Sequence, residues 1–195
     1  MAEYYDWDSA YRNYVFEHWE PIYPSPELAT LVAAGVFERN ARILDAGCGG
    51  GLDAIFLAQC GFHLIGIDIS VAALRVARRR ARKAKVKVDW RLGDVLALPL
   101  EDEAVDFIID RGLLHVIDNK DRSKYASELY RVLKPNGRVL IRGASKKSSK
   151  ERFNPITEKA IRKYFSRFRG GPLLPIPLFS PAGALDGRIA FLTKR

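Results

Sequence analysis

Short apolar runs that end at an aspartate recur through the first two thirds of this 195-residue chain, and helix-like segments separate them. A near-continuous apolar run is typical of a buried parallel strand, and an alternating run of a half-buried one. The predicted strands are Ala41–Leu44, His63–Ile67, Val86–Arg91, Val105–Ile109 and Arg138–Ile141. The predicted helices are Pro26–Phe37, Leu52–Cys60, Val71–Lys83 and Arg122–Leu133. This alternation predicts an α/β fold in which helices cover both faces of a parallel sheet.

The last third of the chain departs from this alternation. A helix is predicted over Ile156–Phe165, with Thr157 as its N-cap. Two strand-like runs follow, Leu173–Phe179 and Ile189–Thr193, and the link 181–187 between them predicts an antiparallel hairpin at the edge of the sheet. Prolines at 172, 175 and 177 place the first run at an edge, because proline cannot donate to a sheet ladder.

Length and composition predict one globular domain without disulfides. We divide it into an aromatic N-terminal cap (1–24), a core (25–143) and a C-terminal helix and hairpin (144–195). Two cysteines, Cys48 and Cys60, cannot form a disulfide framework. The sequence shows neither a secretory signal nor the ~20 apolar residues of a transmembrane helix. We therefore expect a cytoplasmic protein that does not enter membranes, either a monomer or a homodimer.

The glycine-rich loop between the first predicted strand and its helix carries the most chemical information. Its sequence, from residue 45 to residue 52, is DAGCGGGL. Glycines there allow a sharp turn and let a ligand approach the main-chain N–H groups at the start of the helix. Asp68 ends the next strand, where a carboxylate can accept hydrogen bonds from both ribose hydroxyls of an adenosine ligand. Together these features predict an adenosine-containing cofactor.

The loop favours S-adenosylmethionine over NAD as that cofactor. The dinucleotide fingerprint G-x-G-x-x-G, counted from Gly47, requires a third glycine at the position of Leu52. The loop has the pattern G-x-G-x-G instead. Asp45 precedes it and Asp53 follows it, and these carboxylates would repel a pyrophosphate but suit a ligand with ammonium and sulfonium charges.

The segments LDAGCGGG and IGIDIS resemble motif I and its acidic partner in the class I S-adenosylmethionine-dependent methyltransferases. LGDVLALPLEDEAVDFII, DRGLLHVI and LYRVLKPNGRVLI resemble later segments of that superfamily, in the same order. The resemblance covers about residues 27–143. It implies a seven-stranded sheet of order 3-2-1-4-5-7-6 with an antiparallel strand 7, and S-adenosylmethionine as cofactor.

The resemblance also implies which residues bind the cofactor. The glycines would surround its methionine part, supported by Asp45; Asp68 would hold the ribose hydroxyls. Asp94 and the Val95 N–H would meet the adenine, and Asp110 and Arg111 would lie beside the reacting methyl. The implied set is Asp45, Gly47, Cys48, Gly49, Gly51, Asp68, Ile69, Asp94, Val95, Asp110 and Arg111.

Methyl transfer from a sulfonium needs no acid for the leaving group, so positioning and exclusion of water can supply much of the catalysis. His115 is the candidate general base, because a neutral imidazole suits that role near neutral pH. A looser resemblance to small-molecule methyltransferases of the thiopurine and tellurite-resistance type rests on Asp110-Arg111-Gly112 and the aromatic N-terminus. It implies an acceptor pocket lined by Tyr11, Tyr14, Trp19 and His115. No His, Cys or acid spacing predicts a metal site.

Small-molecule methyl transfer is therefore the favoured function, and a nucleic-acid methyltransferase is the alternative. Residues 75–91 hold nine basic and one acidic residue, and residues 138–195 hold fourteen basic and three acidic residues, in a chain of net charge +9. Such clustering favours an anionic partner. However, Asp110-Arg111-Gly112-Leu113 stands where an exocyclic-amine methyltransferase of nucleic acids has Asn/Asp-Pro-Pro-Tyr/Phe. A protein methyltransferase and an inactive adenosine-binding module are the remaining alternatives.

Overall fold

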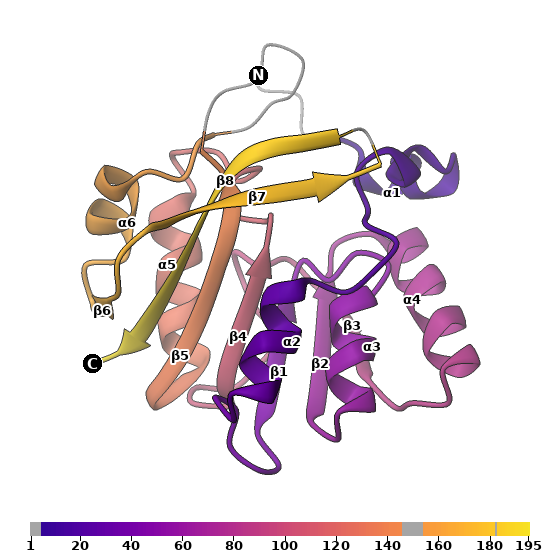
Figure 1. The fold of residues 1–195 in the computed structure, drawn as a ribbon, viewed down its shortest axis with the longest axis horizontal. Helices are drawn as coiled ribbons and strands as arrows, with labels where there is room; N and C mark the ends of the chain where they lie inside the picture. The colour runs from indigo at the N-terminus through magenta and orange to yellow at the C-terminus, as the bar shows by residue number, and fades with distance from the viewer. Residues whose placement is uncertain (1–4, 146–153, 182) are drawn as a thin grey trace.

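One sheet forms the centre of the computed structural model, which describes residues 5–145, 154–181 and 183–195 (Figure 1). Its strands are β1 (Arg42–Ala46), β2 (His63–Asp68), β3 (Asp89–Leu92), β4 (Val105–Arg111), β5 (Leu133–Ala144), β6 (Phe168–Gly170), β7 (Leu174–Ser180) and β8 (Gly183–Lys194). The α-helices are α1 (Trp7–Arg12), α2 (Pro26–Ala33), α3 (Leu52–Gln59), α4 (Val71–Lys83), α5 (Arg122–Val132) and α6 (Glu158–Tyr164). A 3₁₀ helix, η1, spans Val15–His18.

The strand order β3-β2-β1-β4-β5-β8-β6 confirms the predicted α/β fold. Strands β1 to β5 pair in parallel, and β8 runs antiparallel to β5 in the place predicted for strand 7. The carboxyl ends of the parallel strands therefore meet at one edge of the sheet. The loops after β1, β2, β3 and β4 gather there.

The C-terminal hairpin differs from the prediction in its extent. Its second strand, β8, begins at Gly183, so most of the predicted link belongs to it. The first strand, β7, lies at an edge as the prolines predict, and it pairs with the first half of β8. The edge position beside the end of β8 belongs to β6, a short strand that the sequence pattern did not indicate. The described sheet thus has eight strands, where seven are predicted.

Two helix caps account for other boundary differences. The predicted helix as far as Phe37 is too long, because Gly35 takes a φ of +65° and the Val36 N–H bonds back to the last turn of α2. The strand predicted from Val86 begins only at Asp89, because the Val86 N–H closes the end of α4 in the same way.

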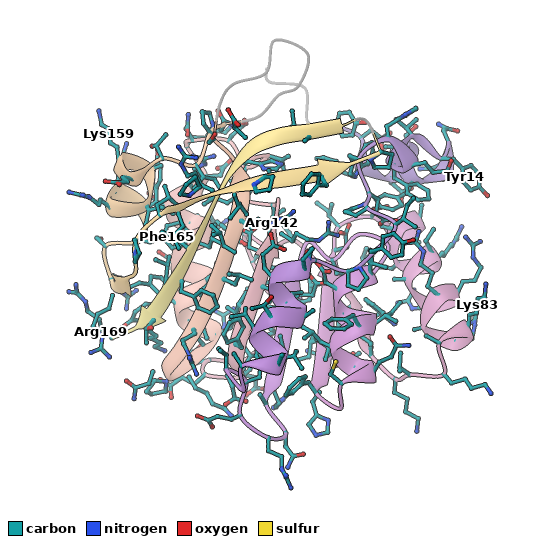
Figure 2. The ribbon with its side chains drawn as sticks, in the orientation of Figure 1. Tyr14, Lys83, Arg142, Lys159, Phe165 and Arg169 are labelled. Carbon is teal, nitrogen blue, oxygen red and sulfur yellow. The ribbon has the colours of Figure 1, made fainter. Side chains whose placement is uncertain are left out.

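Helix α4 shows why its sequence folds as predicted. Ser70 is the N-cap, and its Oγ accepts a hydrogen bond from the Ala73 N–H at 3.0 Å. The alanines, Leu74 and Val76 are buried, whereas most of the basic side chains are exposed. Figure 2 shows Lys83 pointing outward from α4, and Lys159 outward from α6 at the opposite end of the molecule. Most of the basic residues of α4 thus form a solvated helix face.

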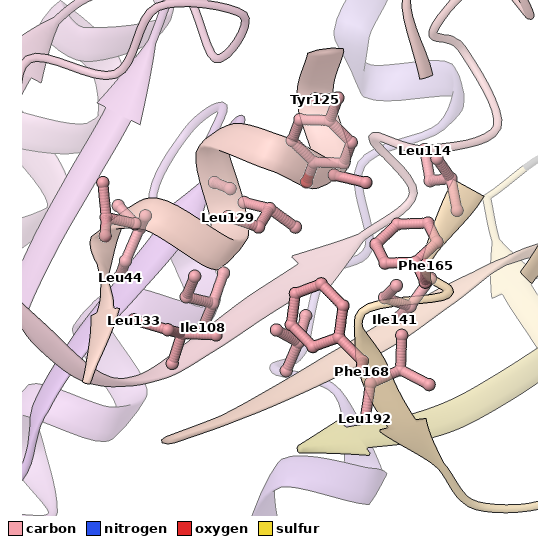
Figure 3. Packing of buried hydrophobic residues seen from close by; sticks show 14 of the residues in the cluster. Leu44, Ile108, Leu114, Tyr125, Leu129, Leu133, Ile141, Phe165, Phe168 and Leu192 are labelled. Atoms are coloured by element: carbon pink, nitrogen blue, oxygen red, sulfur yellow. The ribbon is translucent and has the colours of Figure 1, made fainter. Parts of the chain in front are cut away.

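Two apolar clusters cover the two faces of the sheet. One packs α5 and α6 against β1, β4, β5 and β8, with Tyr125, Leu129 and Phe165 among its buried members (Figure 3). The other packs α2 and α3 against alternate residues of the same strands, including Ile43 and Phe107. A third, smaller cluster joins α1 and η1 to α4. The N-terminal cap is therefore attached through α4, beside the carboxyl edge of the sheet.

Candidate functional site

The glycine loop joins β1 to α3 at the carboxyl edge of the sheet. Gly47, Gly49 and Gly51 have φ values of +66°, +52° and +75°, which side chains other than glycine rarely adopt. A Cβ at Gly51 would lie 2.4 Å from the ring of Trp90. The Cys48 N–H donates to the Ile67 carbonyl of β2 at 3.0 Å, which fixes the loop to the next strand. The Cys48 thiol is buried, and burial raises its pKa, so it is a packing group.

Asp68 ends β2 directly beside this loop. Its Oδ2 accepts a hydrogen bond from the Gly49 N–H, and its Oδ1 accepts one from the Ser70 N–H, each at 2.8 Å. Burial raises the pKa of Asp68. A carboxylate has about four lone-pair sites, so the N–H groups of Gly49, Ser70 and Ile69 do not use all of them. The structure thus places the predicted ribose-binding carboxylate against the predicted loop.

Solvent-exposed apolar side chains lie at the ends of β2 and β3. Ile69 is 60% exposed and Leu92 is 56% exposed. Asp94 is exposed, and its Oδ1 accepts the Leu96 N–H at 2.8 Å. Among the described residues the Val95 N–H has no acceptor. Apolar surfaces with one acceptor and one unpaired donor nearby fit a flat heteroaromatic ring, so this end of the site suits the adenine of S-adenosylmethionine.

A second group of charges lies below the glycine loop. Asp45 is buried there, and burial, together with the nearby carboxylate of Asp53, raises the pKa of Asp45 to about 8. Asp53 forms an ion pair with Arg111 and accepts hydrogen bonds from the Ser25 N–H at 2.8 Å and the Ser25 hydroxyl at 3.0 Å. Ser25 occupies the N-cap position of α2, but its hydroxyl binds Asp53 rather than capping the helix.

Asp110 and Arg111 point to opposite faces of β4, as neighbours in a strand do. The Asp110 carboxylate is buried and accepts hydrogen bonds from the Tyr125 hydroxyl at 2.8 Å and from the Leu113 N–H at 2.7 Å. Burial raises its pKa to about 6. The carboxylate therefore braces the turn between β4 and α5. Only Arg111 of this pair faces Asp45 and Asp53.

His115 lies under the end of β5. Its Nδ1 accepts the Ala144 N–H at 2.9 Å, so the neutral ring carries its proton on Nε2. Burial and the positive charges of Arg122 and Arg142 lower the pKa of His115 to about 3. A base this weak, with its acceptor nitrogen already bound, is poorly suited to take a proton. The geometry supports a bracing role for His115 rather than the predicted general base.

The aromatic side chains predicted to line an acceptor pocket separate into different environments. Tyr11 is buried, and its hydroxyl accepts the Gly50 N–H at 3.1 Å. Trp19 packs edge-on against Tyr11, with ring centroids 6.3 Å apart. Tyr14 is 58% exposed, and Figure 2 shows it at the outer rim of the cap. The structure brings Tyr11 to the glycine loop but does not gather Tyr14 and His115 with it.

Two ion pairs that the sequence pattern did not indicate also contact this region. Glu20 and Arg80 meet at the glycine loop, where they form an ion pair. Farther along, Glu27 pairs with Arg142, and the two line a small cavity together with Ser25, Asp53 and Arg111. All of these partners are far apart in sequence, so no local motif could have paired them. Within the described residues, no group of three or more His, Cys, Asp or Glu could hold a metal ion.

Comparison with known proteins is consistent with this geometry. Residues 43–137 match the model of a methyltransferase domain. An uncharacterized methyltransferase of Schizosaccharomyces pombe is 31% identical over 159 residues, which cover 81% of this chain and 59% of that protein. A probable S-adenosylmethionine-dependent methyltransferase of Mycolicibacterium smegmatis is 35% identical, over 68% of this chain and 46% of its own length. A demethylmenaquinone methyltransferase of Symbiobacterium thermophilum is 37% identical, over 62% and 49%.

Solved structures share the fold. One, from a study of the conversion of a disulfide bond into a thioacetal group during echinomycin biosynthesis, superposes with a TM-score of 0.85 at 22% identity and covers 96% of this chain and 90% of that chain. Magnesium protoporphyrin IX methyltransferase from Synechocystis PCC 6803 with bound S-adenosylmethionine gives 0.70 at 21% identity, over 87% and 77%.

The domain match, the relatives and the fold together place this chain in the class I S-adenosylmethionine-dependent methyltransferase superfamily. S-adenosylmethionine is the cofactor of that superfamily. The chain spans about half the length of the curated relatives that it matches. Among the described residues, no helix has the length and apolar character that crossing a membrane requires.

Proposed function

We propose that the chain transfers a methyl group from S-adenosylmethionine to a small-molecule acceptor by direct in-line displacement. The observation that carries this proposal is the meeting of three features at one edge of the sheet. These are the positive-φ glycine loop, the Asp68 carboxylate bonded to it, and the exposed Ile69 and Leu92 beside the unpaired Val95 N–H.

Each feature would hold a different part of the cofactor. Asp68 would bind the ribose hydroxyls, because its Oδ2 lies against the loop, where it accepts the Gly49 N–H, and the carboxylate keeps lone-pair capacity for a ligand. Asp94 and the Val95 N–H would bind the adenine edge, and Ile69 would cover its face. Asp45 would neutralise positive charge at the methionine end, because it is buried and, within the described residues, no ion pair joins it to a cation.

Catalysis in this proposal rests on positioning and on exclusion of water. S-adenosylmethionine, when bound, would supply a methyl group on a sulfonium, and the thioether that departs as leaving group needs no protonation. The Asp53–Arg111 pair fixes the end of β4 against α3, and Asp110 fixes the turn after it. Residues 7–20 cover the glycine loop on its other side. These contacts would hold the reacting groups in line without a dedicated base.

An acceptor with an apolar ring or chain fits the surroundings of this edge. In Figure 1 the hairpin of β7 and β8 extends across the top of the molecule toward α1. It carries exposed Leu174, Phe179 and Leu185, and the segment before α2 carries exposed Ile22 and Tyr23. Apolar side chains on both sides of the site favour an apolar acceptor. Relatives named as demethylmenaquinone methyltransferases support the same class.

Ligand-induced thermal stabilisation tests the proposal. S-adenosylmethionine at ~100 times its Kd should add about 2.7 kcal/mol to stability, and NAD should add nothing. Asp68→Ala should abolish the gain, whereas Asp102→Ala, at a surface pair remote from the loop, should retain it. Transfer of a radioactive methyl group into quinols and phenols of increasing ring size then identifies the acceptor. Stabilisation by NAD, or by neither ligand, would refute the cofactor assignment.

Nucleic acid is a second candidate acceptor, favoured by the basic faces of α4 and α6. Arg79 and Lys83 on one side, and Lys159 and Arg162 on the other, are exposed. They lie at opposite ends of the molecule, so a polyanion would have to span it (Figure 2). Small-molecule relatives make this the weaker candidate. We also propose a cytoplasmic location and a monomer or homodimer, on the basis of two free cysteines and the exposed edge strand β7.

A further inference from the structure

Glu20 is a buried carboxylate that contacts the glycine loop from the N-terminal cap. Only 8% of the residue is exposed. Its Oε1 accepts hydrogen bonds from the Gly50 N–H at 2.9 Å and from the Tyr11 hydroxyl at 3.1 Å. Its Oε2 lies 2.6 Å from Nη1 of Arg80, which belongs to α4. Burying a carboxylate is costly unless it is paired, and these three contacts meet that cost.

Arg80 completes the contact from the other side. Its Nη1 donates to both Glu20 Oε2 and the Gly50 carbonyl, the latter at 3.1 Å. The guanidinium also lies 5.9 Å from the ring centroid of Phe16. The side chain is 36% exposed, so the pair is open to salt. One ion pair thus joins three segments: the cap, the loop and α4.

Gly50 is the glycine of the loop that the G-x-G-x-G pattern does not require. Its φ is not in the left-handed region, so backbone conformation does not explain it. A Cβ at this position would lie 2.1 Å from Arg80 Nη1 and 2.4 Å from Glu20 Oε1. The space that glycine leaves is therefore filled by the ion pair. The run of three glycines therefore has two roles. It forms the proposed cofactor loop, and at Gly50 it leaves the space that the side chains of Glu20 and Arg80 occupy.

We propose that Glu20 and Arg80 are positioning residues that close the cap over the bound cofactor and control its release. The cap has a second attachment at Asp8, whose Oδ1 accepts the Ser70 hydroxyl and the Ala72 N–H at 2.9 and 2.7 Å. Asp8 and Glu20 hold the cap on both sides of the loop. In this proposal, opening of the Glu20 side speeds release of a cofactor seated on the loop, because that side bonds to Gly50 itself. This inference rests on the proposed cofactor site.

The Glu20–Arg80 ion pair and its hydrogen bonds to Gly50 are called the clasp below. The rate of S-adenosylhomocysteine release, measured by stopped-flow tryptophan fluorescence, tests it. Trp7 and Trp19 lie in the cap and provide the signal. Arg80→Ala should release the ligand about tenfold faster, the effect of losing about 1.4 kcal/mol. Arg80→Lys should restore most of the closure, because an ammonium has enough donors for both acceptors. Arg79→Ala, a neighbouring exposed arginine of α4, is the matched control and should behave as wild type.

Hydrogen exchange of the ligand-free protein gives an independent reading. Relative to the Arg79→Ala control, Arg80→Ala should increase exchange in residues 7–20 more than in β1 and β4. High salt should accelerate release from wild type and not from Arg80→Ala. Equal release rates in Arg80→Ala and Arg79→Ala would overturn the clasp. If neither the wild type nor any variant binds the ligand, the proposed cofactor site is refuted. If hydrogen exchange in the cap is unchanged in Arg80→Ala, the clasp is refuted and the proposed cofactor site is not.

Discussion

Asp45 makes binding of the cofactor a proton-linked event. Burial and the carboxylate of Asp53 raise the pKa of Asp45 to about 8. A group with that pKa is about nine-tenths protonated at pH 7, since one pH unit is a factor of ten in the protonation ratio. A positively charged ligand close by stabilises the ionised carboxylate and lowers its pKa. We therefore expect S-adenosylmethionine to displace the proton of Asp45 when it binds.

The magnitude follows from these values. If the bound ligand lowers the pKa to about 6 or below, the two states differ by at least about 2.7 kcal/mol in their preference for the ionised form. Binding at pH 7 then releases about 0.8 to 0.9 proton. The association constant should rise several-fold per pH unit between pH 6 and 7, and level off above pH 8.

Isothermal titration calorimetry in two buffers of different ionisation enthalpy counts the released protons. Asp45→Asn keeps the size of the side chain but removes the titrating group, so its release should fall by about 0.8 proton. Asp106→Asn is the control. Partial burial acts to raise the pKa of Asp106, but the hydrogen bonds and charges of Lys134 and Arg42 together outweigh it, so the net pKa is lowered and the group is already ionised. Protons from the ligand's own amino group are common to all three proteins. Equal proton release in wild type and Asp45→Asn would refute the reasoning.

Three further predictions use the same site. Tyr125→Phe removes one hydrogen bond from the buried Asp110 carboxylate, and urea unfolding should show a loss of about 1–3 kcal/mol with unchanged m-value. His115→Gln should leave the shape of the pH–rate profile between pH 6 and 8 unchanged, because the pKa of His115 is already lowered to about 3. If the variant loses an inflection near pH 6.5 that the wild type shows, His115 is the general base. RNA binding, measured by filter retention, should be weak and should vanish by 0.2 M salt; retention of tight binding would favour the nucleic-acid acceptor.

The fold could be predicted because its signals are local. The strands β1, β2 and β4 are apolar runs, and Ser70 caps α4 as its sequence indicates. The errors fall where tertiary pairing decides. Leu133 begins β5 by pairing with Val105, although a turn at Asn136 suggests a later start. The three-residue β6 has no pattern of its own, and only its pairing with β8 makes it a strand.

The site divides in the same way. Asp68 and the glycine loop form a pattern over about twenty residues, so the sequence places them at one edge. The partners of Asp53 could not be inferred, because Ser25 and Arg111 lie on other elements, 28 and 58 positions away. The prediction of His115 as a general base rests on residue type alone. Its surroundings, a backbone N–H of β5 and two buried arginines, cannot be inferred from any spacing in the sequence.

The buried carboxyl groups at the loop give pH two opposite effects. A rise in pH should lower the unfolding free energy of the ligand-free protein and should increase the stabilisation that the cofactor provides. Asp45 and Asp68 both have pKa values raised by burial, above those of an unfolded chain. A carboxyl group with a raised folded-state pKa costs stability as pH rises from about 4, its unfolded value, to its folded value. The ligand-free protein should therefore lose unfolding free energy between pH 5 and 8, and the complex with S-adenosylmethionine should lose less, because its Asp45 has the lower pKa. The stabilisation by the cofactor must then grow with pH over that range. Asp45→Asn should reduce the pH dependence both of the ligand-free unfolding free energy and of the stabilisation by the cofactor.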